Sequence, residues 1–204
     1  MEQALAERGD LGRPQARLTL ASTSPQRRAI LEQLRIPFDV VEPAYVEHDP
    51  PGLTPQDLVR GHAEGKARSV HTGGLVTLGV DTTVALDGRT YGKPADREEA
   101  GQMLDELSGR THVVVSGLCL LGPGFEVVED EATEVTFREL SPELRATYLE
   151  SGEWEGRAGG YAIQGLGGRL VERIEGDYLN VVGLPGALLV SLLGSFAPNL
   201  LEIA

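Results

Sequence analysis

Residues 17–28 form a short apolar stretch, a tight polar turn and a helix-start pattern, and this unit constrains the fold more than any other. Leu18 and Leu20 are spaced to share one face of a strand. Ser24 and Pro25 then predict the N-cap and the first position of a helix, because serine accepts a free N–H group and proline has none to satisfy. We therefore expect a helix N-terminus directly after a strand.

The same turn carries groups that suit an anion. Free N–H groups at a helix start attract negative charge, and Ser22 and Ser24 add hydroxyl donors. The guanidinium of Arg27 can hold a phosphate through two parallel hydrogen bonds. The turn therefore predicts a phosphate-binding site, with an ordinary capped helix and solvated arginines as the alternative.

The length of 204 residues suits one substantial domain or two small lobes, and we expect a single domain over 17–204 after an N-terminal extension, residues 1–16. No apolar run approaches 18 residues, and the first residues lack the apolar segment of a secretion signal. The only cysteine, Cys119, cannot form an intramolecular disulfide and lies in an apolar run, so we expect a buried thiol. These features predict a cytoplasmic protein without a membrane segment.

The net charge of −13 disfavours general binding to nucleic acid polymers or to anionic membranes. A polyanionic ligand would need a local basic cluster, helped by a divalent cation. The sequence has no zinc spacing, no Walker A loop, no GxGxxG after a strand and no GxSxG elbow. These absences argue against a P-loop NTPase, a Rossmann dehydrogenase and a serine hydrolase.

The remaining patterns predict helices and strands in mixed order. Helix starts are expected at residues 54–57, 96–99 and 141–143, and a last helix over residues 187–193. Strands are expected over residues 38–41, 111–121, 125–137, 161–165 and 170–174, and an apolar loop over residues 181–185. Asp87-Gly88 predicts a two-residue hairpin turn. The mixture indicates an α/β or α+β fold with a mixed sheet.

Asp81 is the most informative carboxylate. It follows the apolar run 75–80, which predicts a strand buried on both faces that ends at Asp81. Ligands usually bind at such strand ends, where an ionised aspartate can bind Mg²⁺ or orient a water. Glu47, in an acidic loop, is a candidate second metal ligand. The alternatives are a turn aspartate that bonds its own backbone and a solvated loop acid.

The chain has two lysines, Lys66 and Lys93. Lys93 lies between Gly92 and Pro94, where the backbone is restricted, and Lys66 lies on the flank of a predicted helix. Each alone could be a solvated surface charge. Together with Arg27 and the serine turn they would form a grip for a triphosphate.

Several ordered motifs over residues 17–193 together resemble the Maf family of nucleoside triphosphate pyrophosphatases, within the ITPase-like superfamily. The matching segments are Ala21-Ser22-Thr23-Ser24-Pro25-Gln26-Arg27, Gly79-Val80-Asp81-Thr82, Leu86-Asp87-Gly88 with Gly92-Lys93-Pro94, Ser108-Gly109-Arg110-Thr111-His112, Ala158 to Gly165, Ile174 to Tyr178 and Val182 to Pro185. Several motifs in the right order are far more specific than any one alone.

The resemblance implies an ITPase-like α/β fold, with a mixed twisted sheet, flanking helices and two lobes around an active-site cleft, often as a homodimer. It implies hydrolysis of a nucleoside triphosphate to the monophosphate and pyrophosphate with a divalent cation, Mg²⁺ or else Mn²⁺ or Co²⁺. Asp81 would be the catalytic carboxylate and share the metal with Glu47. The phosphates would be bound by Ser22, Ser24, Arg27, Lys66 and Lys93.

Thr82 and Gln164 match the branch of the family that acts on dTTP and UTP, so we expect these two residues and Gln26 to face the base. Gln26 stands where the family has an arginine linked to substrate choice, and Gly156-Arg157 stands where the family has Asp-Lys. Two other functions stay open. One is a pyrophosphatase for purine or modified triphosphates, and the other is a nucleotide-binding regulator of cell division, acting on septum formation without turnover.

Overall fold

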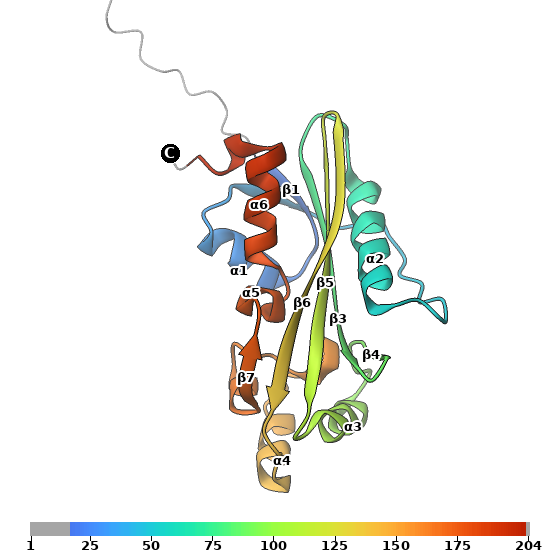
Figure 1. Cartoon of the computed structure of the whole chain (residues 1–204), viewed down its shortest axis with the longest axis vertical. Coiled ribbons are helices and arrows are strands. Elements are labelled where there is room, and N and C mark those ends of the chain that lie inside the picture. Colours follow the sequence, from blue (N-terminus) through green and yellow to red (C-terminus); the bar gives the residue numbers. More distant parts are fainter. Residues whose placement is uncertain (1–16, 203–204) are drawn as a thin grey trace, which may run out of the picture.

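The computed structural model describes residues 17–202, which form a seven-stranded mixed sheet flanked by helices (Figure 1). The sheet order is β2-β1-β3-β5-β6-β7, with β4 beside β3; β1 is parallel to β2 and β3, and the other pairs are antiparallel. The strands are β1 (Leu18–Ala21), β2 (Phe38–Val41), β3 (Thr77–Leu86), β4 (Arg89–Tyr91), β5 (Thr111–Gly122), β6 (Phe125–Phe137) and β7 (Val171–Glu175). The predicted α/β fold with a mixed sheet is confirmed.

The four helices with predicted N-caps begin where the sequence predicts. Side chains of Ser24, Thr54, Asp96 and Ser141 each accept a backbone N–H three residues on, at the starts of α1, α2, α3 and α4. The helices are α1 (Pro25–Gln33), α2 (Pro55–Val70), α3 (Arg97–Leu107), α4 (Pro142–Glu150), α5 (Tyr178–Val182) and α6 (Gly186–Phe196), with 3-10 turns η1 (Ala158–Gly160), η2 (Leu166–Arg169) and η3 (Pro198–Leu200). None of the helices in the described range is long and apolar enough to cross a membrane.

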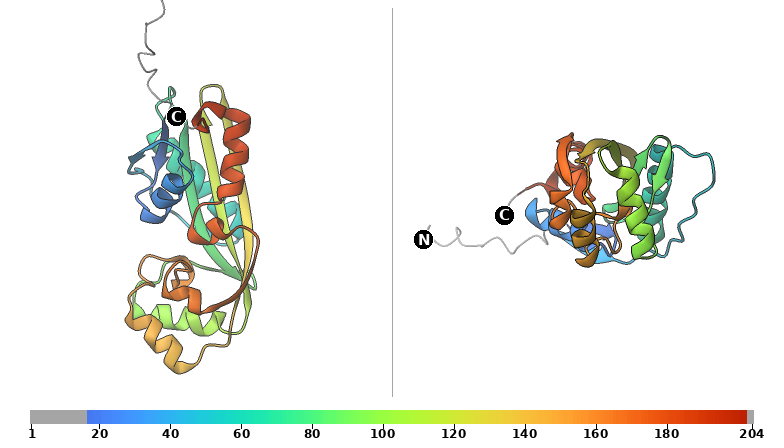
Figure 2. Two further views of the ribbon diagram at one scale, coloured as in Figure 1. Left: turned by 90° about the vertical axis from the view of Figure 1, so that its left-hand side faces the viewer. Right: turned by 90° about the horizontal axis from the view of Figure 1, so that it is seen from below.

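Two hydrophobic clusters share the long strands β3, β5 and β6 and divide the molecule into two lobes (Figures 1 and 2). In the upper lobe, α1 and α6 cover one face of the sheet and α2 covers the other. In the lower lobe, α3, α4 and the 3-10 turns η1 and η2 pack around the far ends of the same strands, with Phe137 and Tyr161 in the core. The continuous strands join both lobes into one body.

The sheet edge opens in the middle of β3. On this edge β1 pairs with β3 only as far as Gly79, and β4 begins its pairing at Val84. The intervening segment, residues 80–83, therefore has no neighbour on this side among the strands of residues 17–202. After Ala21 the chain turns away into the serine turn and α1. A cleft between the lobes begins at this opening.

The prediction that the central strand ends at Asp81 is wrong. β3 continues to Leu86, because on its other edge the ladder with β5 continues from Thr77 opposite Leu121 to Ala85 opposite Val113. Asp81 gains access to the cleft through the missing neighbour on one edge and not through a strand end. Sequence periodicity shows burial but does not show where a neighbouring strand stops.

Two further predictions of local structure are wrong. Residues 161–165 are not a strand but a turn between η1 and η2; Tyr161 and Ile163 alternate with more exposed residues, which imitates a strand. Residues 181–185 are not only a loop, because Val181 and Val182 close the short helix α5. The hairpin is confirmed, since Asp87 and Gly88 both have positive φ, 51° and 80°. Cys119 is buried, as predicted.

His112 makes the stability of the lower lobe sensitive to acid. It is fully buried between Phe137 and Tyr161, and burial lowers its pKa to about 4 from the ordinary value of 6.5. The unfolded chain therefore binds one more proton between pH 6.5 and 4, so stability falls as the pH falls through this range. We expect this histidine to lower the free energy of unfolding by about 3 kcal/mol between pH 6.5 and pH 4.

Denaturant titrations between pH 7 and 4 test this expectation. In His112→Phe the unfolding free energy should depend less steeply on pH, by up to about 1.4 kcal/mol per pH unit. An unchanged slope would show that His112 does not set the acid sensitivity.

Candidate active site

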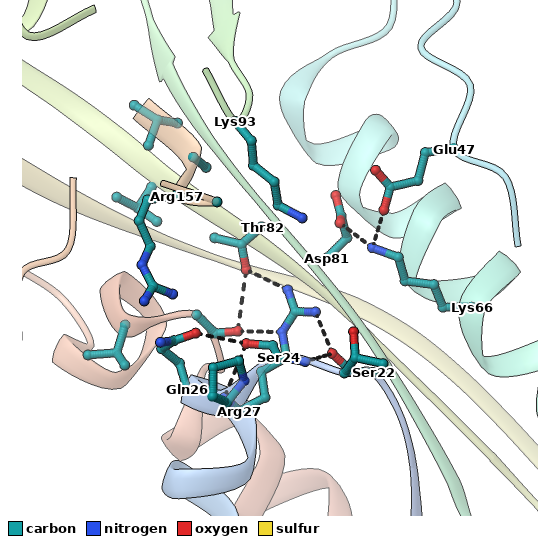
Figure 3. A pocket seen from close by; sticks show the side chains of 18 of the residues that line it. Ser22, Ser24, Gln26, Arg27, Glu47, Lys66, Asp81, Thr82, Lys93 and Arg157 are labelled. Carbon is teal, nitrogen blue, oxygen red and sulfur yellow. Dashed lines mark hydrogen bonds and ion pairs between the residues drawn. The ribbon is translucent and has the colours of Figure 1, made fainter. Parts of the chain in front are cut away.

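A pocket of about 640 Å³ lies between the two lobes, at the opening along β3 (Figure 3). This volume is in the range of small-molecule sites. The upper lobe contributes the serine turn, the start of α1, Lys66 of α2 and the loop that carries Glu47. The lower lobe contributes Lys93 and residues 155–158. A ligand in this pocket would contact both lobes.

Arg27 is fixed in the pocket by three neutral groups. Its Nε donates to the carbonyl of Gly183 at 3.0 Å, and its two terminal nitrogens donate to Ser22 Oγ at 3.1 Å and Thr82 Oγ1 at 3.3 Å. Burial lowers the pKa of Arg27, and the negative charges of Asp81 and Glu47 partly offset this effect. Within residues 17–202 no carboxylate pairs with it directly. Its charge is thus available to an anion.

Two carboxylates converge on Lys66. The Lys66 ammonium lies 2.6 Å from Asp81 Oδ1 and 2.6 Å from Glu47 Oε1, and the lysine is only 8% exposed. Burial alone would raise the pKa of Glu47, but its hydrogen bond to Lys66 and the charges of Lys66 and Lys93 lower the pKa overall. Glu47 is therefore ionised at neutral pH. The arrangement places two oxygen-ligand groups side by side at one end of the pocket.

These two carboxylates suit a hard cation of the magnesium type. Mg²⁺ in enzymes is often held by one or two carboxylates, while water and substrate phosphates complete its coordination. No cluster of three or more metal-ligating side chains occurs in the described part of the chain. Two carboxylates that leave further positions to water and substrate phosphates fit a shared metal–substrate site.

Lys93 and Arg157 bring positive charge from the lower lobe. A hydrogen bond from the Gly159 N–H to the Gly92 carbonyl, 3.0 Å long, ties their two loops together. The Lys93 ammonium points into the pocket from the side opposite Arg27 (Figure 3). Arg157 also lines the pocket, and its Nε is buried without a hydrogen-bond partner. In the described range neither side chain forms an ion pair.

The structure brings together all but one of the residues predicted for the site. The pocket is lined by Ser22, Ser24, Gln26, Arg27, Glu47, Lys66, Asp81, Thr82 and Lys93. Gln164 does not line it, and lies exposed between η1 and η2. Arg157, which stands where the family has a lysine, also lines the pocket, and its position there depends on the folding of the loop before η1.

Two of the residues expected to face the base are engaged with the protein. Thr82 Oγ1 accepts from Arg27, lies 2.9 Å from Ser116 Oγ and can donate to the Gly183 carbonyl at 3.4 Å. Gln26 Oε1 accepts from Ser24 Oγ at 3.2 Å, which leaves its NH₂ group free to donate. Thr82 therefore holds Arg27 in place, whatever else it contacts.

Residues 17–196 match the family model described as Maf-like protein. The chain belongs to the Maf family. The membership that the ordered motifs predicted is thus confirmed over nearly the whole described range.

Curated relatives of this Maf-family chain cover most of its length. Three proteins named dTTP/UTP pyrophosphatase are similar to it. That of Gloeobacter violaceus is 45% identical, with 88% of this chain and 96% of the relative covered. That of Nitratidesulfovibrio vulgaris is 48% identical, with 85% of each covered, and that of Pyrococcus furiosus is 44% identical, with 87% and 94% covered. Among solved structures, the Staphylococcus aureus Ham1 protein aligns with a TM-score of 0.41 at 16% identity, over 59% of this chain and 71% of its own.

Proposed function

We propose that this Maf-family chain hydrolyses dTTP and UTP between the α and β phosphates, giving the nucleoside monophosphate and pyrophosphate. The observation that carries the proposal is the meeting of two carboxylates, Asp81 and Glu47, with unpaired basic side chains in one pocket. The names of the curated relatives support the choice of substrates.

Charge in the pocket favours a polyanion despite the acidic chain. The lining includes four basic side chains, Arg27, Lys66, Lys93 and Arg157, against three acidic ones, Glu47, Asp81 and Glu155. The whole chain has a net charge of −13. Three of the four basic side chains, Arg27, Lys93 and Arg157, form no ion pair within residues 17–202, and they are concentrated where a triphosphate would lie.

Asp81 and Glu47 would hold a divalent cation, Mg²⁺ or else Mn²⁺ or Co²⁺. When bound, such an ion supplies positive charge to phosphate oxygens and makes a bound water more acidic. Lys66 lies between the two carboxylates and orients both of them through its ammonium group.

The side chains of the pocket divide the work of hydrolysis. Asp81 orients a water for attack on the α-phosphorus and accepts its proton. The bond between the α-phosphorus and the bridging oxygen breaks, and the electron pair leaves with pyrophosphate. Arg27, Lys93 and the serine turn offset the charge that grows on the leaving group. The amide of Gln26 is available to donate to a carbonyl of the base.

The family resemblance also leads us to propose a homodimer that works in the cytoplasm, with neither a nucleic acid polymer nor a membrane as partner. Sedimentation of the purified chain tests the dimer, which should have twice the chain mass of 21.8 kDa.

Lys93→Ala should lower kcat/KM for UTP by about 10- to 100-fold, because a hydrogen bond to a charged group is worth roughly 1.5–3 kcal/mol. Steady-state kinetics of pyrophosphate release measure the effect. Arg97→Ala is the control, since Arg97 is an exposed cation of α3 outside this pocket. Equal kinetics in the two variants would show that Lys93 is a solvated surface charge without a role in binding the triphosphate.

Gln26→Arg should sharpen the preference for pyrimidines. An arginine adds a charged donor where glutamine offers a neutral one, and we expect the ratio of kcat/KM for UTP over GTP to rise about tenfold. If this ratio falls in Gln26→Arg, residue 26 does not select pyrimidine bases in the way proposed.

A panel of triphosphates tests the proposed function as a whole. Pyrophosphate release from dTTP, UTP, CTP, GTP and modified nucleotides should be fastest with dTTP and UTP. Faster release from purine or modified nucleotides would assign a different substrate. Binding without any release, with intact protein and added Mg²⁺ or Mn²⁺, would favour a nucleotide-binding regulator instead.

A further inference from the structure

The loop that carries Glu47 lies mostly exposed to solvent. Residues 42–54 join β2 to α2 without regular secondary structure, and the Glu47 side chain is 47% exposed. Its neighbour Val46 is 71% exposed. Water screens an ion pair whose carboxylate is half exposed, so the bond to Lys66 alone is a weak anchor for this loop.

His62 of α2 binds the loop on both sides of Glu47. Its Nδ1 lies 3.1 Å from the hydroxyl of Tyr45, and its Nε2 lies 2.9 Å from Asp49 Oδ1. The histidine is only 4% exposed. A neutral ring with its proton on Nε2 satisfies both contacts, because it donates to the Asp49 carboxylate and accepts from the Tyr45 hydroxyl.

Gly65 gives the ring of Tyr45 its place against α2. A Cβ at position 65 would lie 2.2 Å from Tyr45 Cε2, so any side chain there would displace the ring. The ring also contacts His62 edge-on, with centroids 5.8 Å apart. Tyr45 therefore lies directly against the helix that carries Lys66.

Three positions on one face of α2 thus contact every second residue of the loop, namely Tyr45, Glu47 and Asp49. His62, Gly65 and Lys66 have the i, i+3, i+4 spacing of a single helix face. His62 holds Tyr45 and Asp49, Gly65 admits the Tyr45 ring, and Lys66 holds Glu47 between them. The spacing matches an extended strand of loop laid along a helix.

We propose that His62 is a positioning residue, which, together with the space at Gly65, holds the Glu47 carboxylate beside Asp81 for metal binding. The metal role of Glu47 rests on the proposed function; the holding of the loop does not. Groups that orient a metal ligand typically change metal affinity by about 10- to 100-fold when they are removed.

Two variants and two matched controls test the proposal. His62→Phe keeps a ring but removes both hydrogen bonds, and Gly65→Ala displaces Tyr45 while adding a better helix former. Gly61→Ala is the control for the second, because a Cβ there meets nothing within 4 Å. His71→Phe is the control for the first, because it removes a histidine hydrogen bond, to Thr77, away from the pocket.

Two readouts are measured on the full chain. One is amide hydrogen exchange of residues 42–54, without metal or nucleotide. The other is Mn²⁺ affinity, followed by electron paramagnetic resonance in the presence of α,β-methylene-UTP, which cannot be cleaved at that bond. We expect His62→Phe and Gly65→Ala to speed loop exchange and weaken Mn²⁺ binding about tenfold or more. Gly61→Ala and His71→Phe should leave both unchanged.

The outcomes separate this proposal from the proposed function. Unchanged loop exchange in folded His62→Phe and Gly65→Ala would overturn the proposal, and so would faster exchange with unchanged Mn²⁺ affinity. If His62→Phe fails to fold, Gly65→Ala and Tyr45→Phe decide in its place. If Glu47→Gln leaves Mn²⁺ affinity unchanged, the metal ligation by Glu47 that the proposed function includes fails, whatever the loop exchange shows.

Discussion

Asp81→Asn is expected to lower kcat for UTP hydrolysis at least about a hundredfold while the protein stays folded. Asparagine has nearly the same shape, but it can neither accept the proton of the attacking water nor offer a full negative charge to a cation. The loss of a positioned general base typically costs 10²–10⁴-fold. Pyrophosphate release under saturating UTP measures the effect, and circular dichroism confirms the fold.

Asp39→Asn is the matched control, because Asp39 is an exposed carboxylate on β2 that pairs with Arg17 outside the pocket. It should retain full turnover. Near-normal pyrophosphate release by Asp81→Asn would show that another group activates the water.

Gly79→Ala is expected to reduce the free energy of unfolding by about 3 kcal/mol and to lower turnover with it. A Cβ at this position would lie 2.0 Å from the carbonyl oxygen of Ala63 and 2.8 Å from the backbone nitrogen of Ala67. Backbone atoms in a helix cannot rotate away, so α2 must shift, and overpacking of this kind costs about 1–3 kcal/mol or more. Lys66 lies between these two alanines and would move with the helix.

Thermal unfolding and UTP kinetics measure both effects. A loss of about 3 kcal/mol corresponds to a fall in Tm of about 6–12 °C for a chain of this size. Gly74→Ala is the control, since a Cβ there meets nothing within 4 Å and should change stability by less than about 0.5 kcal/mol. A wild-type Tm in Gly79→Ala would contradict the close packing of α2 on β3.

Local signals were sufficient to predict the helix starts and the hairpin. Ser24, Thr54 and Ser141 each cap a helix and are followed directly by a proline at its first position. Both signals act within a single turn of the chain, so a short stretch of sequence is enough to recognise them. The Asp87-Gly88 turn is equally local. These features need no knowledge of the rest of the fold.

Features that depend on distant neighbours could not be predicted from residue patterns. Asp81 reaches the cleft because β1 stops at Gly79 and β4 starts at Val84, and no local pattern contains that information. Residues 161–165 alternate in burial because of the core below them, although they pair with no strand.

In the candidate site, too, the residues within local motifs could be predicted, whereas those placed by distant contacts could not. Motifs identified the serine turn, Asp81 and Lys93, which all line the pocket. Arg157 enters the pocket only through the loop tied to Gly92, and Gln164 matches a family motif but stays exposed outside it. The base contact of Gln164 therefore remains a prediction.

Hydrolysis of UTP in water enriched in ¹⁸O tests the central claim most directly, because the label marks the phosphorus that water attacks. Mass spectrometry of the products should find one ¹⁸O in UMP and none in pyrophosphate, and Asp81→Asn should form labelled UMP at least about a hundredfold more slowly. Label in pyrophosphate, or release of UDP and inorganic phosphate, would contradict attack on the α-phosphorus in this pocket.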